Sequence, residues 1–272
     1  MITKEIKDFF FSCLHRESGL VLDDSKIYLL ESRLEPLVAQ EGFPSLEEFG
    51  RWLIKVPSSS LIQKVIEAMT TNETSFFRDR IPFDILKNQI IPNLIKMNQK
   101  SHKIRIWSAC CSTGQEPYSI SMLLSEFGPQ IQQWDISILA TDIDQKVLHH
   151  AQLGVYSQYE VQRGLPILFL TRYFNKSDSS WIIRPEIRKR IEFKLFNLMT
   201  DFSSFGVFDV IFCRNVLIYF DVKTKKKILE LMARMLTPSG VLFLGSTETS
   251  IGLTEKIARV QAEKGFYYRK VQ

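Results

Sequence analysis

Hydrophobic residues in the first 70 positions recur at the three- and four-residue spacing of amphipathic helices. Four such stripes are present: Ile6, Phe9, Phe10, Cys13 and Leu14; Ile27, Leu30, Leu34, Leu37 and Val38; Leu46, Phe49 and Leu53; Leu61, Ile62, Val65, Ile66 and Met69. Asp23-Asp24-Ser25 is a helix-cap signal, and Ser45 with Glu48 has capping-box spacing. A small helical bundle is therefore predicted, and a packing role without chemistry is its simplest interpretation.

From residue 104 onward, strand patterns alternate with helix patterns. Residues 104–127 predict a strand, a loop of small polar residues and a helix that begins near Glu116-Pro117 and ends at Gly128-Pro129. Strands are also predicted at 136–141, 208–212 and 241–245, helices through Val147 and Ala151 and over 225–236, a turn at 237–240, and a last edge strand at 265–269. Such alternation predicts an α/β fold, a mainly parallel sheet covered by helices on both faces.

Residues 155–196 interrupt this alternation. A turn is expected at 175–180 before the strand-like 181–183, and residues 191–195 alternate like a strand that returns to the main sheet. A small antiparallel β-subdomain is predicted here. The expected organisation is a helical domain at 1–70, a joining segment and helix at 71–103, and an α/β domain at 104–272 that contains the insertion.

Composition narrows the class of protein. The 272 residues are 45% hydrophobic, yet their longest apolar runs are too short for a membrane span, so a soluble cytoplasmic protein is expected. The net charge is +5. Residues 1–70 contain 8 basic and 11 acidic residues, and the rest of the chain contains 27 basic and 19 acidic residues. The basic residues lack the aromatic interleaving of a single-strand binder, so no nucleic-acid partner is expected. Four cysteines without a C-x-x-C pair or a histidine cluster predict reduced thiols and no metal site.

Candidate chemistry lies where the predicted strands end, because open parallel sheets bind ligands beyond their carboxyl ends. Glu116 follows the loop after the first strand, Asp142 ends the second, and Arg214-Asn215 follows Cys213. Asp142 comes about 30 residues after the first loop and could accept hydrogen bonds from ribose hydroxyls. Because G-x-G-x-x-G is absent, a nucleoside without phosphates fits better than NAD or ATP.

Each of these residues also has a plain structural explanation. Glu116 could complement the helix dipole, Asp142 could help to cap the next helix near Asp144, and Arg214-Asn215 could be an ordinary loop. In the segment TTNETSFFRD (70–79), Arg78 offers a planar donor fork for a carboxylate. The alternative there is a helix cap at Asn72 or Thr74 with a solvated arginine.

Four motifs in order resemble the CheR family of chemotaxis receptor protein-glutamate O-methyltransferases. They are NETSFFRD (72–79), SACCSTGQEPYS (108–119), ATDID (140–144) and FDVIFCRNVLIYFD (208–221). The likeness extends over nearly the whole chain, including the helical domain, the inserted β-subdomain and the L-x-P-x-G-x-L-F-L-G-x-T-E of residues 236–248. A Rossmann-like methyltransferase domain is therefore expected.

The resemblance implies S-adenosylmethionine as cofactor, S-adenosylhomocysteine as product, and the γ-carboxylate of glutamates in chemoreceptor cytoplasmic domains as methyl acceptor. Arg78 and Tyr219 would flank the transferred methyl group, although Tyr219 could also be plain core. The cofactor pocket implied by the matching positions consists of Asn72, Thr74, Arg78, Glu116, Asp142, Asn197, Leu198, Arg214 and Asn215. Methylation of another acceptor, or a non-catalytic cofactor-sensing or scaffold module, is the alternative.

Two departures from the family pattern concern the receptor. The turn at 175–180 is shorter than the glycine-rich loop of members that bind a receptor's C-terminal pentapeptide, which makes such tethering doubtful. The family's N-terminal domain approaches the receptor with basic residues, whereas residues 1–70 are net acidic. Lys26 and Arg33 share one helix side with Glu31 and Glu35, and receptor contact through this face is a hypothesis.

Overall fold

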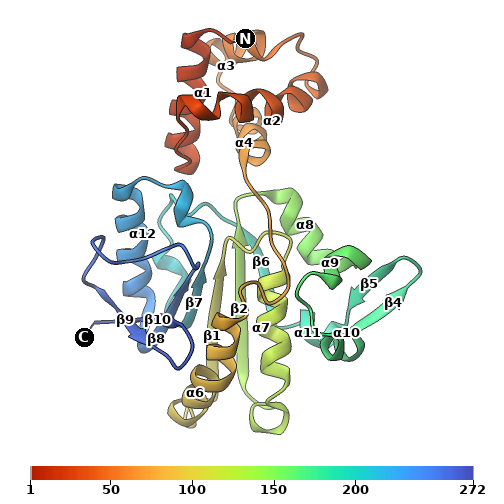
Figure 1. Ribbon diagram of the computed structural model, residues 1–272, viewed down its shortest axis with the longest axis vertical. Coiled ribbons are helices and arrows are strands. Elements are labelled where there is room, and N and C mark those ends of the chain that lie inside the picture. The colour runs from red at the N-terminus through yellow and green to blue at the C-terminus, as the bar shows by residue number, and fades with distance from the viewer. Residues whose placement is uncertain (1, 272) are drawn as a thin grey trace.

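The computed structural model describes residues 2–271, and its first four helices form a separate layer above the carboxyl edge of a sheet (Figure 1). They are α1 (Lys4–Ser18), α2 (Ile27–Gln40), α3 (Leu46–Lys55) and α4 (Ser59–Met69), with the short η1 (Asp24–Lys26) before α2. Their apolar faces meet in one core of Ile6, Phe10, Leu14, Leu30, Leu34, Leu37, Val38, Leu46, Phe49, Leu53, Val65, Ile66 and Met69. The predicted helical bundle is confirmed. None of the helices described is both long and apolar enough to cross a membrane.

An extended segment, residues 70–75, leads from α4 to a contiguous run of α5 (Ile81–Ile85), η2 (Leu86–Ile90) and α6 (Ile91–Met97) (Figure 1). Neither Asn72 nor Thr74 begins a helix, so the alternative of a helix cap there is wrong. Phe77, Asp79 and Arg80 have positive φ angles of 51°, 66° and 50°, a conformation that side chains with a Cβ disfavour. This backbone is stable only if neighbouring contacts hold it.

The main sheet has the order β6-β2-β1-β7-β8-β10-β9, and its first five strands are parallel. Its strands are β1 (Lys103–Ala109), β2 (Asp135–Asp142), β6 (Ile191–Leu195), β7 (Phe208–Cys213), β8 (Leu236–Leu244), β9 (Ile257–Gln261) and β10 (Phe266–Lys270). Helices α5, α6 and α7 (Gln115–Ser125) pack on one face and α12 (Val222–Met235) on the other. Helix α8 (Gln145–Leu153) and the turns η3 (Gly128–Gln130), η4 (Ser203–Phe205) and η5 (Leu217–Tyr219) complete this α/β unit. The predicted α/β architecture is confirmed.

Three local predictions were wrong. The strand near residue 266 is not at the edge, because β10 pairs with both β8 and β9 and buries Tyr267 and Tyr268. The expected turn at 237–240 lies within β8, where the register to β7 shifts between Phe208 and Val210. Helix α12 begins three residues earlier than the predicted 225, because the side chain of Asp221 caps it by accepting from the backbone N–H of Thr224.

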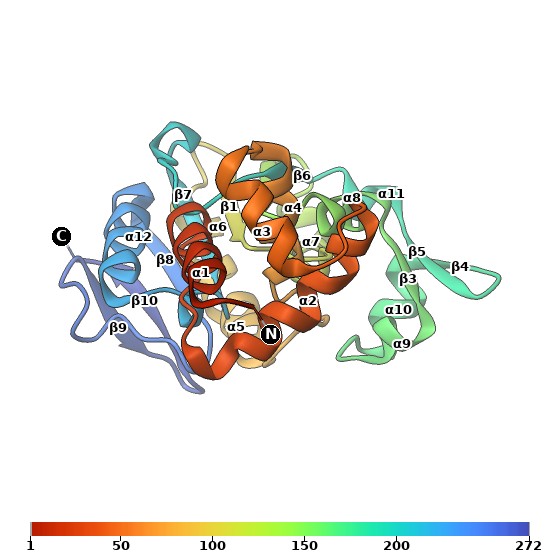
Figure 2. The same cartoon turned by 90° about the horizontal axis from the view of Figure 1, so that it is seen from above.

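The insertion forms a second sheet of three antiparallel strands in the order β3-β5-β4, beside the main body (Figure 2). Its strands are β3 (Val155–Ser157), β4 (Phe174–Ser177) and β5 (Ser180–Ile183), so the turn expected at 175–180 is confined to Asp178 and Ser179. Three short helices that the sequence pattern does not predict accompany them: α9 (Gln158–Gln162), α10 (Ile167–Tyr173) and α11 (Pro185–Arg188). Strand β6 then pairs with β2, so the predicted return to the main sheet is confirmed.

Gly164 of this subdomain packs closely against the backbone of Phe76, in the segment after α4. A Cβ at Gly164 would lie 2.1 Å from the carbonyl oxygen of Phe76, whereas a Cβ at Gly252 would meet nothing within 4 Å. Both residues have positive φ angles, 86° and 75°. Gly252→Ala is expected to lower the free energy of unfolding by about 1 kcal/mol through backbone strain alone. Gly164→Ala should cost about 1–3 kcal/mol more because of the added collision. Urea unfolding measures both, and equal losses would contradict the tight contact.

Candidate active site

One cavity lies at the carboxyl ends of β1, β2 and β7, and its empty space, including the part open to solvent, is about 1040 Å³. The ten residues singled out from the sequence all line it: Asn72, Thr74, Arg78, Glu116, Asp142, Asn197, Leu198, Arg214, Asn215 and Tyr219. The structure thus brings together residues from five separate parts of the chain. Their individual roles stay predictions.

The four helices α1 to α4, here called the helical unit, supply one wall of this cavity. The sequence pattern does not predict this contribution. Ser18, Leu20, Ile66, Met69 and Thr70 all line it. The amide of Asn197 donates to the carbonyl oxygen of Glu17 over 2.6 Å, and the backbone N–H of Val21 donates to the carbonyl oxygen of Tyr219 over 3.0 Å. A packing role alone therefore does not describe the four-helix unit.

Asp142 ends β2 with both carboxylate oxygens directed to backbone groups. Oδ2 accepts from the N–H of Ser112 over 2.8 Å and Oδ1 from the N–H of Asp144 over 3.1 Å. Burial raises the pKa of Asp142 to about 6, although these N–H groups oppose the shift. The cap of α8 is Asp144, whose side chain accepts from the N–H groups of Lys146 and Val147 and from the amide of Asn72. Asp142 itself does not cap the helix.

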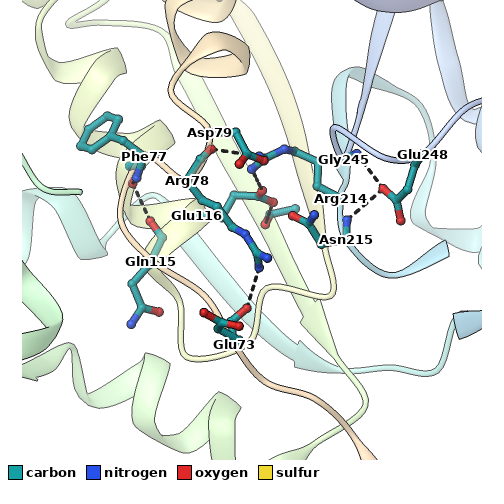
Figure 3. Close-up of polar contacts among 12 residues, drawn as sticks. Glu73, Phe77, Arg78, Asp79, Gln115, Glu116, Arg214, Asn215, Gly245 and Glu248 are labelled. Atoms are coloured by element: carbon teal, nitrogen blue, oxygen red, sulfur yellow. Dashed lines mark hydrogen bonds and ion pairs between the residues drawn. The ribbon is translucent and has the colours of Figure 1, made fainter. Parts of the chain in front are cut away.

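A buried arginine joins three parts of the site (Figure 3). The guanidinium of Arg214, only 2% exposed, donates to Glu116 over 2.9 Å and to Asp79 over 2.7 Å. It also donates to the carbonyl oxygen of Arg78 over 2.9 Å, and the second oxygen of Glu116 accepts from the hydroxyl of Ser108 over 2.8 Å. Glu116 therefore pairs with a buried cation as well as standing in the first turn of α7.

Arg78 and Tyr219 are both half-buried at the cavity wall. The guanidinium of Arg78 donates to the carbonyl oxygen of Glu73 over 2.7 Å (Figure 3), so it is not simply solvated. Tyr219 lies in the turn η5 after β7, where its ring packs against the edge of the core beneath α12. Its side chain is thus neither plain core nor free surface.

Glu248 was missed as a structural determinant of the site, although it ends a motif noted in the sequence. Its carboxylate accepts from four backbone N–H groups, those of Asn215, Val216, Leu217 and Gly245, at 2.6–2.9 Å. It thereby fixes the loop that carries Asn215, whose φ angle is 58° (Figure 3). Spacing along the chain does not reveal these contacts, because Glu248 and the loop of Asn215 meet only in the folded protein.

Cysteine thiols border the cavity but are held protonated. Cys110 and Cys111 line it, and Cys213 lies buried beside them at the end of β7. Burial raises the pKa of all three thiols well above the ordinary value, and the carboxylate of Asp142 adds to the shift at Cys110 and Cys111. Between residues 2 and 271, no three histidine, cysteine, aspartate or glutamate side chains are grouped closely enough to hold a metal ion.

Glu248→Gln is expected to lower the free energy of unfolding by about 2 kcal/mol, because an amide can accept with one oxygen only and its NH₂ faces backbone donors. Glu255→Gln, at an exposed position of the following loop, is the matched control and should change stability very little. Urea unfolding of both variants measures the difference. Similar stability of the two variants would show that the four N–H groups find other partners.

Two family models together match most of the chain. Residues 8–70 match the all-alpha domain of CheR methyltransferase, and residues 72–266 match its SAM (S-adenosylmethionine) binding domain. The chemotaxis protein methyltransferase Cher2 of Pseudomonas putida is 43% identical over 260 residues, 94% of each chain. Chemotaxis protein methyltransferase 1 of Pseudomonas aeruginosa is 42% identical over 267 residues, 96% of each chain. The resemblance inferred from the motifs is confirmed, and the chain belongs to the S-adenosylmethionine-dependent CheR methyltransferases.

Proposed function

We propose that this methyltransferase transfers a methyl group to the γ-carboxylate of glutamates on the cytoplasmic helices of a chemoreceptor, giving glutamyl methyl esters. The observation that carries the proposal is that Arg78 and Tyr219, two groups suited to a carboxylate, line the same cavity as Asp142, a group suited to a ribose. The chemotaxis names of the relatives point to the same class of substrate. A cytoplasmic location belongs to this proposal.

The cavity fits S-adenosylmethionine, a nucleoside without phosphates. Each oxygen of Asp142 accepts one backbone N–H and has capacity for another bond, which suits two neighbouring ribose hydroxyls. Leu198, Ile66 and Met69 offer apolar surface to a base. Asn72, Thr74, Glu116, Asn197, Arg214 and Asn215 complete the proposed pocket. When bound, the cofactor supplies an electrophilic methyl group on a sulfonium.

The acceptor requires orientation more than activation. A glutamate carboxylate is already ionised at pH 7, so no general base is needed. The guanidinium of Arg78 can hold a carboxylate through two N–H groups, and the hydroxyl of Tyr219 can donate one further hydrogen bond. Enclosure by the helical unit removes water from the carboxylate, which leaves its attacking oxygen less solvated.

Binding of S-adenosylhomocysteine should weaken as the pH falls below about 6, because the protonated Asp142 loses acceptor capacity for the ribose. Since its folded pKa is raised above 3.8, the ionised group destabilises the unliganded fold above about pH 6, and this cost disappears toward pH 4. Calorimetric titration between pH 5 and 8 is the measurement. Asp142→Asn should bind weakly at every pH, whereas Asp135→Asn, at the exposed start of β2, should behave like the wild type. A pH-independent wild type would contradict the ribose role.

Incubation with methyl-labelled cofactor and receptor-containing membranes tests the reaction itself. Glutamyl esters release their label in mild base, so label that is absent or survives base would contradict the proposal.

Tyr219→Phe should lower turnover about tenfold by removing one hydrogen bond, with unchanged cofactor affinity. Tyr159→Phe, on the exposed surface of α9, is the control. A parallel loss of cofactor affinity in Tyr219→Phe would show that the hydroxyl serves the cofactor instead.

A further inference from the structure

The first turns of α12 carry an unusual concentration of positive charge. Lys223, Lys225, Lys226 and Lys227 lie within its first six residues, and none forms an ion pair with another residue in the described part of the chain. Lys223, Lys226 and Lys227, here called the α12 patch, are exposed. Cations at a helix N-terminus are unfavourable because the helix dipole is positive there. The stability of α12 therefore does not explain these lysines.

Nearby acidic groups offset only part of the charge of the patch, although, beside the hydrogen bonds from Ser203, Lys227 helps to lower the pKa of Asp201. Asp201 and Glu230 border the same shallow hollow as the three lysines. The carboxylate of Asp201 accepts from the backbone N–H and the hydroxyl of Ser203, both at 2.9 Å, and Glu230 lies 3.7 Å from Lys256. The hollow, which Arg234 also lines, keeps an excess of positive charge.

The helix that carries the patch begins directly after two residues that line the cavity, Tyr219 and Phe220. Only Phe220 and the capping residue Asp221 separate Tyr219 from α12. Ile218 and Val222 are 48% and 68% exposed, although both are large apolar side chains. Val21, whose backbone bonds to Tyr219, is 42% exposed. These exposed apolar side chains could pack against a partner that the neighbouring positive charge attracts.

On the helical unit, Arg33 of α2 is engaged within the molecule. The guanidinium of Arg33 donates to the carbonyl oxygens of Met69 and Thr70 over 2.7 and 3.2 Å and to the hydroxyl of Thr71 over 3.1 Å. Lys26 lies 3.6 Å from Asp23. Arg33 thus joins α2 to the end of α4, which leaves its guanidinium less available to a receptor, whereas Lys26 makes only a local, exposed ion pair.

We infer that the α12 patch, with Ile218 and Val222, docks an acidic segment of the methyl-accepting protein beside Tyr219. The inference rests on the proposed function, because a substrate presenting glutamates carries the complementary charge. Contacts between exposed charges steer the encounter and orient the partner. A segment held there lies next to the cavity in which its carboxylate reacts.

A double charge reversal, Lys223→Glu/Lys227→Glu, tests the inference against Lys96→Glu/Lys100→Glu, which changes the net charge equally. Lys96 and Lys100 are exposed near the amino end of β1, opposite the cavity. With a purified, lipid-free cytoplasmic fragment of a chemoreceptor, the α12 variant should raise KM about tenfold and leave kcat within about twofold. The control should match the wild type, and added salt should narrow the difference. Glutamates favour the start of a helix, so the α12 variant keeps its fold, which unchanged S-adenosylhomocysteine affinity verifies.

Three results would overturn the inference. One is an unchanged KM in the α12 variant, and another is an equal rise in the control, which would indicate net charge only. The third is a defect that occurs with receptor in anionic vesicles but not with the lipid-free fragment, since the patch would then bind lipid. Failure of the proposed function is distinguishable, because the wild type would then transfer no base-labile label to the receptor.

Discussion

The position of the cavity depends on one buried cation. Arg214 is neutralised by Glu116 from α7 and by Asp79 from the segment after α4, and it also bonds to the carbonyl oxygen of Arg78. Removing either carboxylate would take an ionic partner from a buried guanidinium whose Nε already lacks a hydrogen-bond partner among the described residues, which is strongly unfavourable. The same bonds hold a backbone with three left-handed residues, so the orientation of Arg78 follows from the burial of Arg214.

The helical unit and the sheet enclose one cavity, because polar contacts join the two at the edge of that cavity. His15 lies 2.7 Å from Asp221, the residue that caps α12. The backbone N–H of Thr224 and then the hydrogen bond from His15 lower the pKa of Asp221 to about 2. With the contacts from Asn197 to Glu17 and from Val21 to Tyr219, these bonds place α1 directly over the loops that carry the functional groups.

The features that the sequence predicted correctly are those set by short segments of the chain. The stripes of the helical unit and the strand-end residues were found because periodicity and strand termini are properties of short segments. Whether β10 is an edge strand depends on β9, whose single buried residue, Ile257, gives no strand pattern. The roles of Glu248 and Arg33 depend on backbone groups brought near by the tertiary fold, and no spacing along the chain reveals them.

The raised thiol pKa values have a consequence for chemical selectivity. A methyl donor is an alkylating agent, and a thiolate is a far stronger nucleophile toward it than a carboxylate. Cys110 and Cys111 border the cavity, yet burial and the carboxylate of Asp142 keep them in the unreactive thiol form. Two cysteines can therefore line a cofactor cavity without competing for the methyl group.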